Sequence, residues 1–175
     1  MYYYLYVPAN HPSSRINEDY LRSVIFGLQD SLVSTTGVVI GLSATVPDKK
    51  LVLIASIITV AVEAISMAAG QYVSEKSLHQ LNSTKHRDNL LVGSLLMLVS
   101  YSLAGMIPIV PITVLAYPLA PVASGFLTLL AFVVIGLVRS RLTASNAWRN
   151  IFELLGIGGT ATLVGVAVGF LLQKI

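Results

Sequence analysis

Apolar residues dominate the chain in five long stretches, separated by short segments that carry most of the charge, such as "PDKK" and "SEKS". A membrane-spanning helix needs about 20 mostly apolar residues, and each stretch is close to that length. The pattern predicts an all-α integral membrane protein with five transmembrane helices, approximately at 23–46, 51–73, 90–107, 114–138 and 151–172. Residues 1–22 are expected to form a tail, and 23–175 a single transmembrane domain.

Prolines interrupt the region between the third and fourth predicted helices. Because proline lacks a backbone donor, "PIVP" at 108–111 is expected to follow the end of the third helix. Pro118 and Pro121 either open the fourth helix or kink its first turns, and the sequence does not distinguish these alternatives. Strands are disfavoured, because the apolar–polar alternation of barrel strands is absent.

Composition excludes a soluble globular domain. The 175 residues are 55% hydrophobic and only 11% charged, against about 25% charged in typical soluble domains. There are no cysteines, so disulfides and thiolate metal sites are excluded. The net charge of +3 is small and lies in the loops, so nucleic-acid binding is not expected. The start, "MYYYLYVPANHPSSR", lacks the order of a cleavable signal peptide.

Lysine and arginine are distributed unequally between the two sets of connecting segments. One set holds Arg15, Arg22, Lys76, Lys85, Arg87, Arg139, Arg141 and Arg149, and the other holds Lys49, Lys50 and Lys174. Because short cytoplasmic loops are enriched in these residues, the N-terminus is expected in the cytosol and the C-terminus on the opposite side. The sequence does not distinguish the plasma membrane from that of a vacuole-like organelle.

Two acidic residues lie well inside the predicted helices, Asp30 in the first and Glu63 in the second. Each costs about 2.5–3.5 kcal/mol or more at the bilayer centre, so such residues usually face a bundle interior and mark an ion or proton path. The competing interpretation is a protonated carboxyl that satisfies the backbone of a neighbouring helix.

Helical spacing brings further residues onto the faces of these two acids. Ser34 follows Asp30 by four residues, and Met67 follows Glu63 by four. At 1.5 Å per residue, Asp30 and Met67 each lie about 9 Å from the cytosolic end of their antiparallel helices. The two side chains are therefore expected to face each other at one level.

An oxygen ligand beside a thioether suits a borderline divalent metal such as Fe(II), Mn(II) or Co(II), whereas Mg(II) and Ca(II) take oxygen alone. The competing interpretation of Met67 is a packing or lipid-facing side chain. Because burial favours a neutral carboxyl, metal binding at Asp30 or Glu63 would displace a proton. Exchange of metal for protons therefore has a physical basis.

Two glycine pairs, Gly37 with Gly41 and Gly165 with Gly169, have the GxxxG spacing that lets helix backbones approach closely. Either pair could serve a dimer seam. The three histidines fall in the tail or the second connecting segment, so neither a diiron or zinc cluster nor a serine–histidine pair is expected at membrane depth. An enzyme is therefore not predicted.

Two segments resemble the paired signatures of the vacuolar iron transporter family. "FGLQDSLVSTTGVVIGLSA" at 26–44 resembles G-L-x-D-G-L-V-S-T, and "SMAAGQYVSEKS" at 66–77 resembles S-M-A-x-G-E-Y-x-S. The likeness continues through "GSLLMLVSYSLAGMIPIVP" and "RNIFELLGIGGTATLVGVAVGFLL". It implies a five-helix homodimer that moves Fe(II), and often Mn(II), out of the cytosol in exchange for protons. The path lies between the subunits and is lined by the first two helices, and the family's aspartate and methionine ligands match Asp30 and Met67.

Three positions depart from the family pattern. Ser31 replaces a glycine, Gln71 replaces the glutamate of "GEY", and Glu63 stands where relatives usually have a small residue. Our hypothesis is that Glu63 takes over the role of the missing acid as metal ligand, proton carrier or both. Ser34 and Gln71 are then candidates for secondary lining of the path.

The segment from Ser74 to Asp88 is short, as in nodulin-like relatives, and lacks the carboxylate-rich domain that plant and protist iron transporters insert. Glu75 and His79 lie four residues apart within it and are candidates for cytosolic metal capture, with His86 nearby. The competing interpretation is a solvated helix end.

The leading functional prediction is a secondary transporter that exports divalent iron or manganese in exchange for protons. The metal is then a substrate, and no permanently bound cofactor is expected. The expected partners are the lipid bilayer, a second copy of the chain, divalent metal ions and protons. The alternative is a non-transporting membrane assembly or scaffold protein with the same fold, which Gln71 and the missing domain favour.

Overall fold

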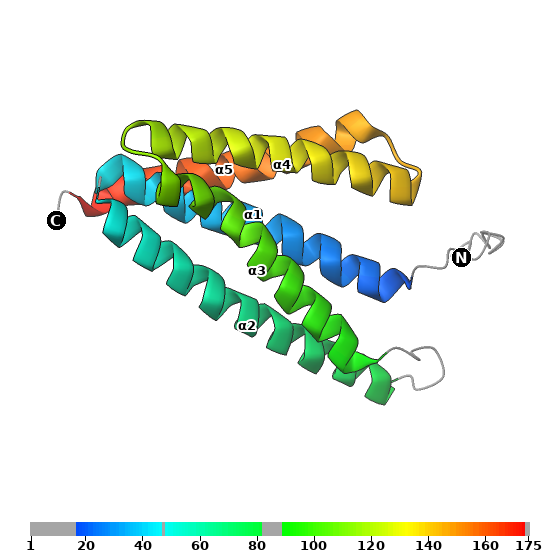
Figure 1. Cartoon of the computed structure of the whole chain (residues 1–175). Coiled ribbons are helices and arrows are strands. Elements are labelled where there is room, and N and C mark those ends of the chain that lie inside the picture. Colours follow the sequence, from blue (N-terminus) through cyan, green and yellow to red (C-terminus); the bar gives the residue numbers. More distant parts are fainter. Residues whose placement is uncertain (1–16, 47, 82–88, 174–175) are drawn as a thin grey trace, which may run out of the picture.

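The computed structural model of the chain describes residues 17–46, 48–81 and 89–173, and these contain helices and no strand. The helices are α1 (Glu18–Thr45), α2 (Lys49–Leu81), α3 (Leu90–Val114), α4 (Leu119–Thr143) and α5 (Ala147–Leu172) (Figure 1). Each of the five is long and apolar enough to cross a membrane, as predicted. Of the N-terminal tail predicted at 1–22, residues 1–16 lie outside the described residues.

Three asparagines begin the helices that start at one end of the bundle. The side chain of Asn17 accepts a hydrogen bond from the backbone of Asp19, and Asn89 and Asn146 do the same at the starts of α3 and α5. Such caps satisfy backbone donors that the first helical turn leaves free. We call this end, where α1 begins and α2 ends, the N-terminal end of the bundle.

Helix α1 lies at the centre and packs on all four of the other helices. It is the least apolar of the five, and all of its serine and threonine side chains except Ser34 are buried in the protein instead of facing lipid. Within the described residues, α2 packs on α1 and α3 alone. In Figure 1 the α2–α3 pair and α4 diverge toward the N-terminal end, with α1 between them.

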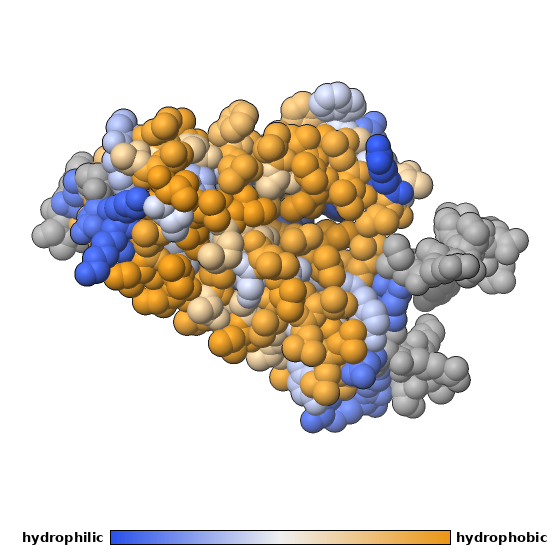
Figure 2. Space-filling view, viewed as in Figure 1, coloured by the Kyte–Doolittle hydropathy of each residue, from blue (hydrophilic) through white to orange (hydrophobic). Residues whose placement is uncertain are grey.

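Large apolar side chains cover the outer surfaces of the helices, as Figure 2 shows for one face. Ile58, Val62 and Ile65 of α2, for example, are all more than half exposed. Hydrophilic residues gather toward the two ends of the molecule in this view. This distribution is typical of a bundle that is surrounded by hydrocarbon.

Several helix ends differ from the predicted ones. Helix α1 begins at Glu18, inside the predicted tail, and α2 continues to Leu81, so Ser74 to Leu81 are helical and not part of a loop. The polar residues at both ends continue the helices beyond the apolar stretches. A prediction that counts apolar residues finds the membrane-crossing part and misses these extensions.

Helix α3 was predicted to end at 107, and this was wrong, because it continues through Pro108 and Pro111 to Val114. Both prolines are buried, and Ser124 of α4 donates a hydrogen bond to the carbonyl of Pro108. Membrane helices tolerate proline where neighbouring helices and hydroxyl side chains surround the altered backbone. Sequence alone does not reveal such neighbours.

The alternatives for the start of α4 are resolved in favour of an opening role for both prolines. Pro118 occupies the position before the helix and Pro121 lies in its first turn. The missing donor costs little there, because the first backbone N–H groups of a helix have no partner within it.

Candidate functional site

A group of polar side chains lies at mid-helix depth where α1, α2 and α3 meet. Ser34 of α1 and Tyr101 of α3 both donate hydrogen bonds to the same carboxylate oxygen of Glu63 on α2, the first at 2.9 Å. The hydroxyl oxygens of Ser34 and Tyr101 are 2.8 Å apart. These three residues and Asp30 form what we call the central cluster.

Asp30 belongs to this cluster through its charge. Its carboxylate lies one helical turn from Ser34 on α1 and interacts electrostatically with Glu63 and Tyr101. Asp30 and Glu63 are both half-buried, whereas Tyr101 is fully buried. Because Ser34 contacts Glu63 and Asp30 lies one turn away on the same face of α1, the two intramembrane acids lie where α1 and α2 meet.

Met67 lies on α2 one turn from Glu63, toward the N-terminal end of the bundle, and is half-buried. The four-residue spacing keeps Met67 on the face that carries Glu63. Two carboxylates and a thioether are thus placed on adjoining helices. Oxygen together with sulfur is a donor set suited to borderline divalent metals.

Tyr101 is a member of this cluster that the helical spacing of the acids did not reveal. Its sequence context, "LVSYSLAG", offers one signal, a phenolic hydroxyl deep inside an apolar stretch. Buried tyrosines usually place their hydroxyl on a polar partner. Ser31 is also fully buried and donates a 2.6 Å hydrogen bond to the carbonyl of Tyr101, so the serine that replaces the family's glycine contacts the backbone of the cluster.

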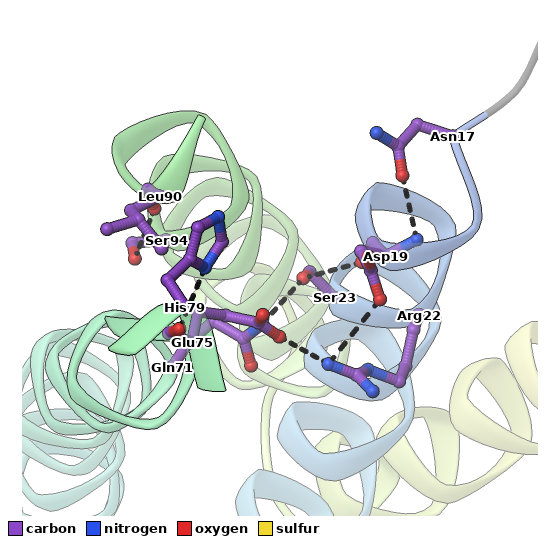
Figure 3. Close-up of polar contacts among 9 residues, drawn as sticks. All are labelled: Asn17, Asp19, Arg22, Ser23, Gln71, Glu75, His79, Leu90 and Ser94. Carbon is purple, nitrogen blue, oxygen red and sulfur yellow. Dashed lines mark hydrogen bonds and ion pairs between the residues drawn. The ribbon is translucent and has the colours of Figure 1, made fainter. Parts of the chain in front are cut away.

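A second polar group, the end cluster, lies at the N-terminal end between α1 and α2 (Figure 3). Arg22 forms an ion pair with Glu75, and its guanidinium also lies 3.8 Å from Asp19. The amide of Gln71 donates to Ser23 and to Glu75, each at 3.1 Å. Gln71 therefore contacts the end cluster, two turns of α2 away from Glu63.

Glu75 and His79, the candidates for metal capture, have different hydrogen-bond partners. The carboxylate of Glu75 accepts from Arg22 and Gln71, whereas Nδ1 of His79 lies 2.9 Å from the backbone carbonyl of Glu75. His86 lies outside the described residues. Among the described residues, no group of three or more histidine, aspartate and glutamate side chains is arranged to hold a metal ion.

The two glycine pairs contact each other within the chain. A Cβ added at Gly165 of α5 would lie 2.6 Å from the carbonyl oxygen of Gly37 on α1, and one added at Gly41 would lie 2.9 Å from the backbone of Gly165. Gly169 approaches Gly41 and Thr45 similarly. The pairs thus bring α1 and α5 together, and a groove beside them extends to Ser34 of the central cluster.

The comparisons with known proteins agree with this architecture. The model of the VIT family matches residues 21–90 and 78–170, which together cover most of the chain. No curated protein matches the chain. The family match confirms the resemblance to vacuolar iron transporters that the two motifs indicated. The chain belongs to the VIT family, whose members transport metal ions across membranes.

Proposed function

We propose that this protein is a secondary transporter that exports divalent iron or manganese from the cytosol in exchange for protons. The observation that carries the proposal is the hydrogen bond from Ser34 to Glu63 at mid-helix depth, one helical turn from Asp30, which puts both acids where α1 meets α2. Two carboxylates placed together inside membrane-crossing helices are costly and usually mark an ion path. Membership of the VIT family supports a metal ion as the transported species.

Asp30, Glu63 and Met67 are the proposed metal ligands, and Ser34 lines the path beside them. Carboxylate oxygens attract any divalent cation, while the thioether of Met67 favours Fe(II), Mn(II) or Co(II) over Ca(II). The metal is the substrate, so it binds and leaves in each cycle. Asp30 and Glu63 are the groups proposed to carry protons in the opposite direction.

A second copy of the chain completes the proposed site. Asp30 and Glu63 are only half-buried in the single chain, and a carboxylate that faces lipid is costly. Both α2 and α5 pack on α1 but not on each other, which leaves the face of α1 between them uncovered. A two-fold axis along this face would bury the acids and double the number of ligands.

The charge bias indicates which end of the bundle faces the cytosol, and hence where an exported metal would enter. Among the described residues, Arg22, Lys76, Arg139, Arg141 and Arg149 belong to the N-terminal end of the bundle, and Lys49 and Lys50 to the other end. By the positive-inside rule the N-terminal end is cytosolic. The metal then passes from the end cluster toward the central cluster.

The proposal is tested with purified protein in liposomes that contain a pH-sensitive dye. Fe(II), Mn(II), Co(II) and Ca(II) are compared for the wild type, Asp30→Asn and the control Glu153→Gln. Glu153 is a half-exposed carboxylate paired with Arg139 at the N-terminal end, so its substitution removes an acid outside the site. We expect saturable iron or manganese flux with opposed proton movement, which Asp30→Asn abolishes and Glu153→Gln leaves unchanged.

Other outcomes separate the alternatives. Metal flux without proton movement would support a metal uniporter and overturn the exchange. No flux for any metal, from folded and dimeric protein, would overturn transport and support the membrane scaffold. A monomer that transports at the wild-type rate would overturn the two-fold site.

A further inference from the structure

The polar contacts of the end cluster join α1 and α2 at the end opposite to the short segment that connects them. At the opposite end, three residues, 46–48, connect the two helices directly. At the N-terminal end, Arg22 and Ser23 of α1 contact Glu75 and Gln71 of α2 (Figure 3). Within the described residues of one chain, α2 packs on α1 and α3 alone, so only these two helices hold it in place there.

The ion pair joins groups in unequal surroundings. The side chain of Glu75 is only 8% exposed, whereas that of Arg22 is 59% exposed. A buried carboxylate needs a partner, because an unpaired buried charge is strongly unfavourable. The same guanidinium nitrogen that pairs with Glu75 also lies 3.8 Å from the carboxylate of Asp19. Arg22 of α1 therefore supplies the positive charge that balances Glu75, and its side chain is exposed.

Gln71 supports the same arrangement and explains a departure from the family motif. Its amide donates to Glu75 one turn along α2 and to Ser23 across the gap to α1. An ionised glutamate at this position could not donate to Glu75 and would place a second carboxylate beside it. The neutral amide of Gln71 can thus donate to both helices and hold them together.

The ion pair also lies nearer to the N-terminal end of the bundle than the proposed metal ligands. Glu75 is eight residues from Met67 on α2, and Arg22 is eight residues from Asp30 on α1. At 1.5 Å per residue, both distances along the helices are about 12 Å. A cation that moves between α1 and α2 from the N-terminal end must therefore pass the level of the ion pair before it reaches Asp30.

We propose that the Arg22–Glu75 ion pair is a gate at the cytosolic mouth of the metal path. While Arg22 is paired with Glu75, α1 and α2 are held together and the cytosolic mouth of the path is closed. Release of Arg22 lets α2 move away from α1 and frees the carboxylate of Glu75 for the incoming dication. This inference rests on the proposed function for its direction, but the gate itself is a property of the two helices.

The gate is tested by the distance between spin labels in liposomes, without metal. The chain has no cysteine, so labels at Glu18→Cys and Lys76→Cys, both exposed helical positions, report on α1 and α2, and dilution with unlabelled chain removes distances between two copies. The variants are Arg22→Gln, Glu75→Gln and the charge exchange Arg22→Glu with Glu75→Arg. Arg139→Gln is the matched control, because it breaks the Arg139–Glu153 pair between α4 and α5.

We expect Arg22→Gln and Glu75→Gln to give a longer mean distance and a broader distribution. The charge exchange should restore the wild-type distribution, and Arg139→Gln should not change it. Glu75→Gln leaves no buried charge, so it keeps the test valid if Arg22→Gln fails to fold. A wild-type distribution in both single variants, or no restoration by the exchange, would overturn the gate.

Flux measurements on the same variants separate this inference from the proposed function. We expect Arg22→Gln to raise the initial rate several-fold at sub-saturating metal on the cytosolic side, relative to Arg139→Gln. If no metal is transported by any variant but the distances change as expected, the gate stands and the transport proposal fails. If metal is transported and the distances do not change, the transport proposal stands and the gate fails.

Discussion

The hydroxyl of Tyr101 on α3 donates a hydrogen bond to the carboxylate of Glu63 on α2, in the middle of two membrane-crossing helices. Ser34 of α1 donates to the same oxygen. Glu63 is therefore oriented by two helices other than its own. A carboxylate held in this way is positioned before any metal arrives, which reduces the cost of ordering a ligand.

Replacing Tyr101 with phenylalanine removes one of these two donors while retaining the buried ring. A hydrogen bond to a charged group contributes about 1.5–3 kcal/mol, so we expect a lower melting temperature in detergent. Metal affinity should fall as well, because Glu63 becomes less well oriented. Thermal unfolding and flux at several metal concentrations measure the two effects. Tyr72→Phe, a half-buried tyrosine on α2, is the control, and equal effects of both substitutions would contradict the role of Tyr101.

Met67→Leu should change metal selectivity while retaining the fold, since leucine conserves volume and apolarity. Loss of the thioether should weaken binding of Fe(II) and Co(II) more than binding of the harder Mn(II). A tenfold loss of affinity corresponds to about 1.4 kcal/mol. Competition between the three metals in the liposome assay measures the change. Met106→Leu, on an exposed face of α3, should leave selectivity unchanged, and the same result for Met67→Leu would exclude sulfur ligation.

Alanine at Gly165 should destabilise the bundle, whereas alanine at Gly37 should be tolerated. The added Cβ would lie 2.6 Å from the carbonyl oxygen of Gly37 in the first case, and 3.5 Å from its nearest neighbour, the carbonyl oxygen of Ala161, in the second. Overpacking of this kind typically costs about 1–3 kcal/mol. Thermal unfolding of the two variants compares one close contact with one ordinary contact between the same helices. Equal melting temperatures of the two variants would contradict the close approach of α1 and α5 at Gly165.

Gln71→Glu, which restores the residue usual in the family, should destabilise this chain. The new carboxylate would lose the hydrogen bond donated to Glu75 and would repel that buried acid from one turn away. Loss of such a bond alone costs about 1 kcal/mol or more. The melting temperature should fall relative to Gln80→Glu, an exposed position on the same helix. An unchanged or higher melting temperature would contradict the arrangement of the end cluster.

The sequence was sufficient to predict the helices and the depth of their acids. Runs of about 20 apolar residues identify membrane-crossing helices, since each unsatisfied backbone group in hydrocarbon is costly. The same reasoning singled out Asp30 and Glu63, which lie where α1 meets α2. It failed at the ends of α2 and α3, because polar helical turns extend beyond the membrane and because Ser124 and other neighbours surround Pro108.

Contacts between side chains of different helices were decided only by the tertiary structure. Helical spacing tells which residues share a face, but it does not tell which face meets which neighbour. The contact of Tyr101 with Glu63 and the contacts of Gln71 with Ser23 and Glu75 therefore could not be predicted. The sequence by itself determined where polar groups enter the membrane, because burial of charge is costly whatever the fold. Their partners depend on how five helices pack, which is a property of the whole bundle.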